Sequence, residues 1–139
     1  MKLFTWDDRY VLGYPQIDRE HEALFALAEK VLDAQHRGIE KDQVRELFER
    51  VINYTRIHFA HEEALMDQHD YPGAGGHIAE HRKLIAKILE FHTKFEADQF
   101  ALSAETLHFL RMWLDQHIRQ ADQLVVVHMR RRERALTHA

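Results

Sequence analysis

The sequence contains no cysteine, and this absence excludes several kinds of site at once. Disulfides, thiolate metal sites and cysteine nucleophiles all require that residue. Basic residues are not in excess either: the formal net charge is −4, which argues against a nucleic-acid partner because such proteins usually carry a basic face. No apolar run is long enough to cross a bilayer, and the N-terminus lacks the apolar segment of a signal peptide. We therefore expect no membrane insertion and a cytoplasmic location.

Residues that break helices are also scarce, because the 139 residues include only two prolines and five glycines. No segment alternates apolar and polar residues as a half-buried strand would. Apolar residues recur instead every three to four positions between the breaks, which predicts long helices. The predicted elements are an extended N-terminal arm over 1–17, helices over 18–36, 41–68 and 76–96, a fourth helix capped by Ser103, and a basic tail over 130–139 that frays.

Four long helices joined by short turns predict an all-α fold. Consecutive helices with such short connections run in opposite directions, so we expect an antiparallel up-down-up-down four-helix bundle. The chain shows no internal repeat and no low-complexity linker, and 139 residues fit one domain with its own core. We therefore expect a single domain over 1–139.

Histidine is the one residue type present in unusual number, with twelve copies. Several of them, and one glutamate, lie on the helix stripes where packing calls for apolar side chains. A buried ionisable group is costly unless a partner satisfies it. In an antiparallel bundle the start of one helix meets the end of the next, so these residues are predicted to converge at one end of the bundle. They are His21, His58, Glu62, His77, His81 and His117.

The spacing of these residues fits metal coordination. His77 and His81 lie at i,i+4, as do His58 and Glu62, so both members of each pair can face one ion. Asp122 follows His117 by five residues, which leaves the two side chains about 140° apart on a regular α-helix. Either Asp122 lies on another face, or the helix widens there into a π-bulge of the kind found at functional sites.

The number of candidate ligands favours two ions. Five histidines and two carboxylates are too many for a tetrahedral zinc site. Two roughly six-coordinate ions need about twelve bonds. With bridging carboxylates and one shared oxygen, the set leaves one open position, which suits a small ligand that binds reversibly.

Four motifs, in order, cover nearly the whole chain. The first, W…G…IDREH, ends at His21; the others are HFAHEEALM from His58, HIAEH from His77, and WLDQHIRQAD, which ends at Asp122. Together they resemble the motifs of the hemerythrin family, and they look most like the single-domain bacterial hemerythrins. HxxxH alone is a weak signal, whereas the four motifs in this order and spacing are specific.

The resemblance implies two non-haem iron ions joined by carboxylate and oxo or hydroxo bridges. It also implies that Leu114 and Ile118, which flank His117, line a dry oxygen pocket. Three histidines would bind one iron and two would bind the other, with both carboxylates bridging. The implied ligands are His77, His81 and His117 for one iron, His21 and His58 for the other, and Glu62 and Asp122 as bridges.

The implied function is reversible O2 binding without catalysis, for oxygen storage, delivery or buffering. We expect a monomer, with an oxygen-consuming protein as the recipient of O2. One alternative is a di-iron enzyme that handles peroxide or nitric oxide, which a histidine-rich ligand set disfavours. The other is an oxygen or redox sensor, for whose output module 139 residues leave no room.

Other histidines compete for these roles. His61 neighbours Glu62 but lies about 60° around the helix from His58, and the i,i+4 spacing favours His58. His92 and His128 keep to the inward stripes, yet they lie some 16 Å along the helix axis from His81 and His117. We therefore expect them to be boundary residues and not metal ligands.

Overall fold

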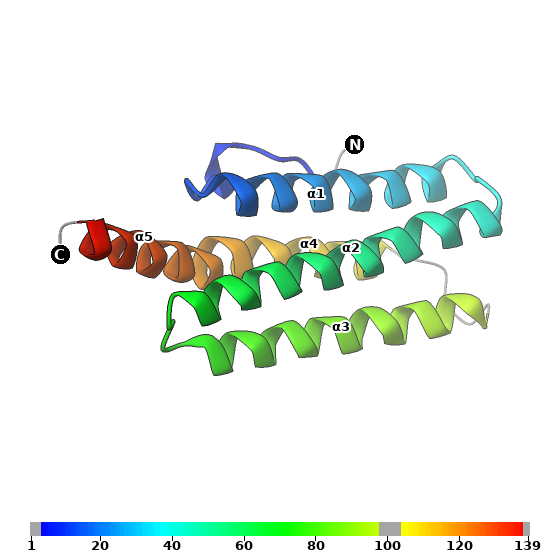
Figure 1. The fold of residues 1–139 in the computed structure, drawn as a ribbon. Coiled ribbons are helices and arrows are strands. Elements are labelled where there is room, and N and C mark those ends of the chain that lie inside the picture. Colours follow the sequence, from blue (N-terminus) through cyan, green and yellow to red (C-terminus); the bar gives the residue numbers. More distant parts are fainter. Residues whose placement is uncertain (1–3, 98–103, 138–139) are drawn as a thin grey trace.

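The computed structural model describes residues 4–97 and 104–137, and most of them lie in helices. Within these ranges there is no strand. The elements are a 3-10 helix η1 (Asp8–Tyr10), α1 (Pro15–His36), α2 (Lys41–Gln68), α3 (Ala74–Glu96), α4 (Ala104–Gln116), a π-helical segment η2 (His117–Asp122) and α5 (Gln123–Thr137). Because α4, η2 and α5 form one continuous rod, the structure is a bundle of four rods (Figure 1). The predicted all-α antiparallel bundle is confirmed.

The first helix begins earlier than predicted. It starts at Pro15 and not at Asp18, since proline suits the first turn of a helix, where its missing N–H is not needed. The Asp18 carboxylate instead accepts hydrogen bonds from the backbone N–H groups of Leu12 and Gly13, at 2.8 and 3.0 Å. Gly13 has a φ of 86°, in the left-handed region that glycine adopts without strain, and this turns the arm into the helix. The arm therefore ends at Tyr14.

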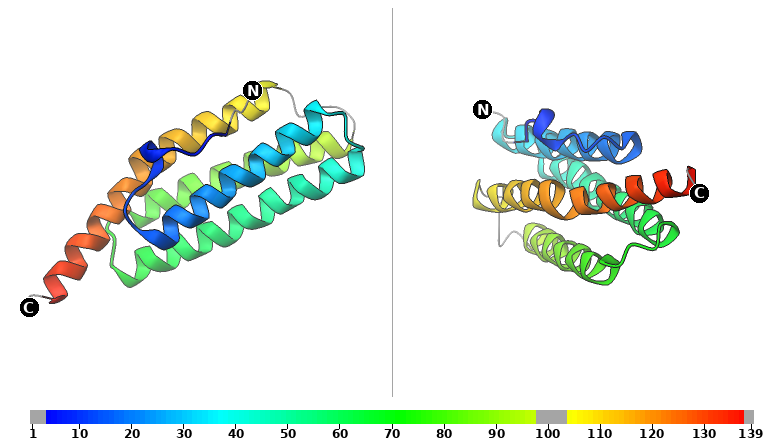
Figure 2. Two further views of the ribbon diagram at one scale, coloured as in Figure 1. Left: turned by 90° about the horizontal axis from the view of Figure 1, so that it is seen from above. Right: turned by 90° about the vertical axis from the view of Figure 1, so that its left-hand side faces the viewer.

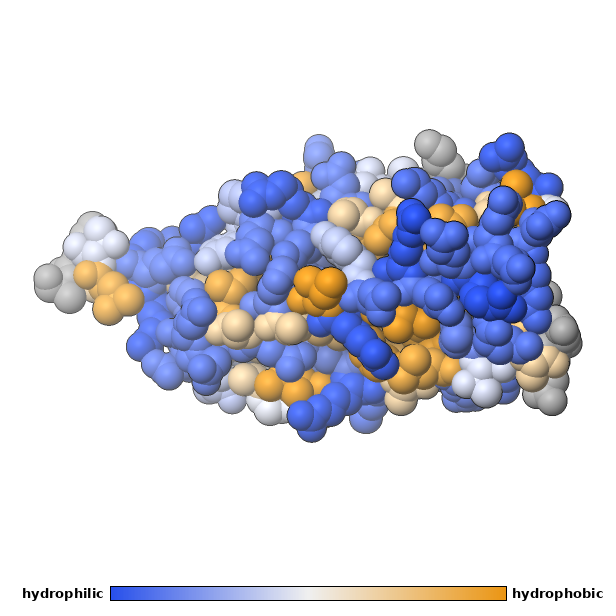
Figure 3. Space-filling view, turned by 45° about the vertical axis from the view of Figure 1, so that its right-hand side comes forward, coloured by the Kyte–Doolittle hydropathy of each residue, from blue (hydrophilic) through white to orange (hydrophobic). Residues whose placement is uncertain are grey.

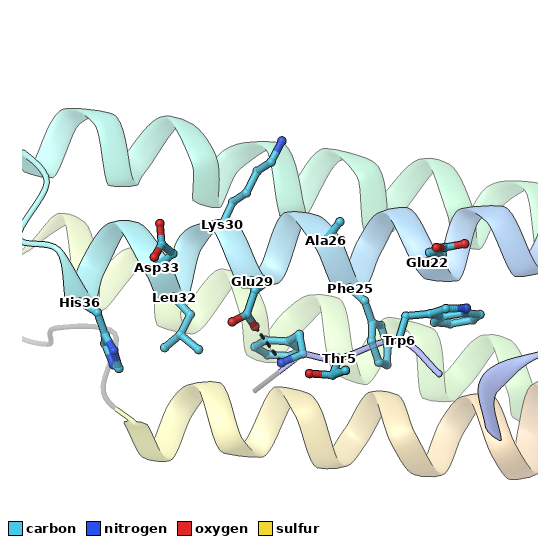
Figure 4. Close-up of a pocket in the computed structure, with 11 residues that line it drawn as sticks. Thr5, Trp6, Glu22, Phe25, Ala26, Glu29, Lys30, Leu32, Asp33 and His36 are labelled. Atoms are coloured by element: carbon cyan, nitrogen blue, oxygen red, sulfur yellow. Dashed lines mark hydrogen bonds between the residues drawn. The ribbon is translucent and has the colours of Figure 1, made fainter. Parts of the chain in front are cut away.

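The N-terminal arm packs along α1 through aromatic rings. The ring of Phe25 on α1 meets those of Phe4, Trp6 and Tyr10 edge-on, with centroids 4.8 to 6.3 Å apart. The Tyr10 hydroxyl donates to the Asp115 carboxylate at 2.7 Å, which ties the arm to α4. A surface cavity of about 750 Å³ remains between the arm and α1 (Figure 4), and none of the seven predicted ligands lines it.

The end of the last rod also differs from the expectation. Helix α5 continues to Thr137, through most of the tail that was predicted to fray, and it extends beyond the other rods (Figure 2). Arg132 pairs with Asp70 at 2.7 Å, and the Arg130 guanidinium lies 4.9 Å from the centre of the Tyr14 ring. These contacts hold the first part of the tail against the α2–α3 turn and the arm. The predicted cap Ser103 lies outside the described residues.

The apolar core is divided in two. The larger part fills most of the bundle and includes Leu24, Phe59 and Leu84. A smaller part closes the end near the α2–α3 turn and consists of Ile17, Met66, Val125, Val126 and Met129. The stretch of bundle between these two clusters is polar. Outside, hydrophilic side chains cover most of the face drawn in Figure 3, and apolar side chains lie in separate patches.

Candidate metal centre

All seven predicted ligands lie together between the two apolar clusters. Each comes from the body of a helix, and each is at most 6% exposed. Their buried positions follow from the i,i+4 pairs on α2 and α3 and from the single inward histidine of α1. The set consists of His21 from α1, His58 and Glu62 from α2, His77 and His81 from α3, and His117 and Asp122 from η2.

The candidate ligand atoms form two groups that share both carboxylates. Within each group, one atom from every residue lies within 4.8 Å of the others. Three histidines belong to the first group and two to the second. The groups are Glu62, Asp122, His77, His81 and His117, and Glu62, Asp122, His21 and His58.

Each carboxylate directs one oxygen towards each group. Glu62 Oε1 lies 2.5 Å from His77 Nε2 and 3.2 Å from His81 Nε2, whereas its Oε2 lies 3.4 Å from His58 Nε2. Asp122 Oδ1 lies 3.0 Å from His77 Nε2, and its Oδ2 lies 3.1 Å from His21 Nε2. Two carboxylates arranged in this way can each bridge a pair of cations.

The fourth rod contributes Asp122 because its helix is not regular there. Residues His117–Asp122 form a π-helix, in which hydrogen bonds join residues five apart. His117 and Asp122 therefore face the same side, with His117 Nε2 3.1 Å from Asp122 Oδ1. Of the two alternatives that the five-residue spacing left open, the structure has the π-bulge.

The π-helix also shifts the buried stripe of the rod. A regular helix would place Leu124 inward, yet Leu124 is 61% exposed. Val125, Val126 and Met129 are buried in its place. The buried stripe of Leu107, Leu110 and Leu114 therefore does not continue at regular α-helical spacing beyond His117.

Three glutamates outside the cluster orient its histidines. The Glu20 carboxylate accepts a hydrogen bond from His58 Nδ1 at 2.7 Å. In the same way Glu63 lies 3.0 Å from His81 Nδ1, and Glu80 lies 3.1 Å from His117 Nδ1. Donation by Nδ1–H to a carboxylate leaves the Nε2 lone pair of each ring free for a metal ion.

Sequence reasoning missed these three glutamates, although each is adjacent in sequence to a candidate ligand. A residue next to an inward ligand lies about 100° around the helix and so faces the neighbouring rod. Glu20 on α1 thus reaches His58 on α2, and Glu63 on α2 reaches His81 on α3. Adjacency to a ligand is the signal that could have identified them.

Two aromatic rings fix the orientation of histidine rings at the edge of the cluster. Phe59 stacks on His81, with centroids 3.7 Å apart and planes 3° from parallel. Trp113 stacks on His117 at 4.3 Å and 16°. Phe59 is buried, while the edge of His117 lines a surface cavity of about 440 Å³ together with Trp113 and Glu80.

The predicted rival ligand does not join the cluster. The His61 side chain is 48% exposed, and its Nδ1 lies 2.6 Å from the second oxygen of Glu20. His128 Nε2 donates to the backbone carbonyl of His69 at 2.7 Å, so it too has a partner elsewhere. Both residues therefore lie outside the candidate site, as expected.

Charges in the cluster hold several groups in their ionised forms. Burial lowers the pKa of His58, but the Glu20 and Glu62 carboxylates outweigh it and raise the pKa to about 9. Burial also lowers the pKa of His77, but the Asp122 and Glu62 carboxylates outweigh it and raise this pKa to about 10. Burial and the Asp122 charge raise the pKa of Glu62, whereas contacts with three histidines bring it down to about 2.

Even so, the protein leaves much of the cluster without hydrogen bonds. Both ring nitrogens of His21, His58 Nε2, Glu62 Oε2 and both oxygens of Asp122 are buried and have no hydrogen-bond partner. Buried polar atoms of native proteins are normally satisfied, so a group of unsatisfied ones calls for an explanation. All of these residues belong to the histidine–carboxylate cluster, and a bound cation would satisfy imidazole nitrogens and carboxylate oxygens together. The residues present therefore fit a metal ion.

A small apolar cavity adjoins the cluster on the side of the larger core. Its volume is about 20 Å³. Leu24, Thr55, Leu84 and Leu114 line it, and each lies three residues from a histidine of the cluster. The predicted pocket residue Leu114 thus lies at this cavity. Ile118 is buried in the larger core but is not among the residues that line the cavity.

Comparisons with known proteins agree with this geometry. A family model described as the hemerythrin HHE cation binding domain matches residues 12–127. A bacteriohemerythrin of Stenotrophomonas maltophilia is 32% identical over 123 residues, which span 88% of this chain and 79% of that protein. The bacteriohemerythrin of Methylococcus capsulatus is 29% identical over 125 residues, 89% of this chain and 95% of the relative.

Solved structures show the same similarity. The crystal structure of a wild-type hemerythrin superposes with a TM-score of 0.83 and 27% identity, and the match covers 90% of this chain and 96% of that one. A hemerythrin variant superposes with a TM-score of 0.86 over 93% of this chain. None of the helices in the described part of the chain combines the length and the apolar character of a membrane span. From its motifs, its fold, its buried histidine–carboxylate cluster and these matches, the chain belongs to the hemerythrin family.

Proposed function

We propose that the protein binds O2 reversibly at a pair of non-haem iron ions, without catalytic turnover. In this proposal His77, His81 and His117 hold one iron, His21 and His58 hold the other, and Glu62 and Asp122 bridge them. The observation that carries the assignment is the division of the carboxylate oxygens, with one oxygen of each residue directed to each histidine group. Bound iron would supply the reversible electron transfer to O2, which no side chain of this chain can provide.

The protein's own contribution is orientation and the exclusion of water. Nine residues line the small cavity beside the cluster, and Thr55 is the only one of them with a polar side chain. Its hydroxyl donates to the Val51 carbonyl at 2.7 Å, so it offers no free donor to a water molecule. Apolar cavities of this kind stay dry and accept small apolar guests. Because water and anions compete with O2 for an open metal position, a dry approach favours reversible binding.

The ligand set also favours binding over oxygen activation. Ferritin-like bundles that activate O2 use a carboxylate-rich site with two Glu-x-x-His motifs. The only such string in the sequence runs from Glu105 to His108, and His108 belongs to neither of the two described ligand groups. We therefore favour a role in oxygen storage, delivery or buffering over a peroxide- or nitric-oxide-handling enzyme or a sensor.

Cycling between oxygen levels tests this function. When the anaerobic, reduced and iron-loaded protein is mixed with O2, we expect a new absorption band, and removal of O2 should restore the starting spectrum over repeated cycles. Chain from which iron has been removed by a chelator serves as the control and should show no change. Oxidation that persists after O2 is removed would contradict reversible binding and would favour the enzyme or sensor alternative.

Metal binding should also release protons. Metal coordination requires neutral imidazole. Without metal, His58 and His77 have pKa values of about 9 and about 10, so both carry a proton at neutral pH. We therefore expect iron uptake at neutral pH to release protons, which a pH-indicator dye in weak buffer would detect, and mild acid to expel the iron.

The same shifts give the sign of the pH dependence for the metal-free chain. A histidine whose pKa is higher in the folded chain than in the unfolded chain stabilises the fold. This contribution is complete when the pH is below the pKa of the unfolded chain, about 6.5, and it is lost once the pH passes the pKa of the folded chain. Stability of the metal-free chain should therefore fall as the pH rises from about 6.5 and level off once the pH passes about 9 to 10, as measured by urea denaturation. For the proton-release prediction, metal uptake at neutral pH without any release of protons would contradict the assignment of His58 and His77 as ligands that are protonated in the metal-free chain.

A further inference from the structure

A second group of possible metal ligands lies at the opposite end of the bundle from the seven-residue cluster. Glu49 is in the first half of α2, and His92 and Glu96 are in the last two turns of α3. One ligand atom from each of the three lies within 4.8 Å of the other two. His92 follows His81 by eleven residues on the same helix, or about 16 Å along its axis, so this group and the main cluster share no residue and no ion.

The His92 ring is held in one orientation. It stacks on the buried ring of Phe48, with centroids 5.6 Å apart and planes 16° from parallel. This contact directs Nε2 to the gap between the two carboxylates, 3.5 Å from Glu49 Oε1 and 3.7 Å from Glu96 Oε1. His92 Nε2 is inaccessible to solvent and makes no hydrogen bond. A buried imidazole nitrogen that faces two carboxylates and makes no hydrogen bond calls for a partner, and a cation between the three side chains would supply one.

The surrounding charges leave this group with a negative excess. Two cations, Arg45 and Lys41, lie near the two carboxylates, and Arg45 contacts Glu96 while also lying 2.5 Å from Asp42, so it is shared between two acidic residues. Lys41 donates to the backbone carbonyl of Glu96 at 3.3 Å. Arg45 therefore competes with any metal ion for Glu96, while the Glu49 side chain is 52% exposed.

We propose that Glu49, His92 and Glu96 form a second, separate site for a divalent transition-metal ion, of which Zn²⁺ is the best-suited probe. One imidazole and two carboxylates are a ligand set that zinc accepts, and water completes the coordination where a site has only three protein ligands. His92 and Glu96 at i,i+4 supply two ligands from one helix face, and Glu49 supplies the third from the neighbouring helix. An ion there would link α2 and α3 at the end opposite their connecting turn.

Calorimetric titration of the iron-loaded full-length chain with Zn²⁺ tests this site, with iron measured before and after. We expect one zinc ion per chain to bind while the iron content stays unchanged, and the His92 imidazole signals to shift in NMR spectra. Replacing a residue that only supports a metal ligand already weakens binding roughly 10- to 100-fold. His92→Gln removes a ligand and should weaken Zn²⁺ binding by at least that factor.

Matched variants separate this site from non-specific binding. Glu46→Gln changes an exposed glutamate on the same helix, and His36→Gln changes an exposed histidine; both should leave Zn²⁺ affinity unchanged. Arg45→Gln removes the competing cation and should strengthen binding. Circular dichroism and iron content check that each variant is folded. The proposal would be overturned if zinc bound only in the amount by which iron was lost. It would also be overturned if His92→Gln bound Zn²⁺ as tightly as the unmodified chain, or if Arg45→Gln bound it more weakly.

Discussion

Replacing Glu62 by alanine is expected to abolish the binding of a pair of iron ions. Glu62 is buried, and its two oxygens face different histidine groups, so the substitution removes one bond from each proposed ion. Asp122→Ala should have the same effect, because Asp122 divides its oxygens in the same way. Elemental analysis of the purified variants measures the result as iron per chain, which should fall from two to one or none.

Glu62→Ala should also destabilise the metal-free protein. Its carboxylate stays ionised among histidines whose pKa values it raises, and removing one partner of a buried ion pair typically costs about 3–5 kcal/mol. Glu46→Ala is a matched control on the same helix, since Glu46 is exposed and pairs with the exposed Arg50. If both bridging variants kept two irons per chain, the bridging assignment would be wrong.

Phe59→Ala has the second largest expected effect. The ring is 4% exposed, and truncation of a buried phenylalanine typically costs about 3–5 kcal/mol in stability. It also stacks on His81 at 3.7 Å, so its loss frees an imidazole that the proposed iron site requires in one orientation. We expect a large fall in the urea midpoint together with weaker iron retention.

Phe59→Leu provides the comparison for that substitution. Leucine keeps much of the apolar volume but has no flat face to lie against His81. We therefore expect Phe59→Leu to recover most of the stability while iron retention stays below that of the unmodified chain. A loss in Phe59→Ala of less than about 1 kcal/mol would show that the surrounding core collapses around the gap.

Much of the fold could be predicted from the sequence because its helices are long and strongly periodic. The helix over Lys41–Gln68 has the predicted limits, and the one that ends at Glu96 begins only two residues earlier than expected. The convergence of polar residues was also predictable, since it needs only inward stripes and antiparallel connections. The start of α1 was less predictable, because Asp18 is a favourable cap residue in sequence yet in the structure it binds the arm.

Two features of the site could not be predicted from spacing. The π-helix at His117–Asp122 depends on tertiary contacts that outweigh the preference for regular α-helix, and every inward position after it shifts. The carboxylate partners of the histidines depend on which rod neighbours which, and on side-chain directions. Glu80 looks like an ordinary solvent-facing residue of α3 until His117 from the fourth rod lies beside it.

The π-helix in the fourth rod makes chain length at that point as important as side-chain identity. It is equivalent to one additional residue in an otherwise regular helix, so the rod has one helical phase before His117 and another after it. Deleting a single residue there would restore a uniform phase. The carboxylate would then swing away from the histidines, and Val125, Val126 and Met129 would rotate out of the end cluster in the same step. Closure of that end of the bundle and assembly of the metal centre therefore both depend on the same additional backbone residue.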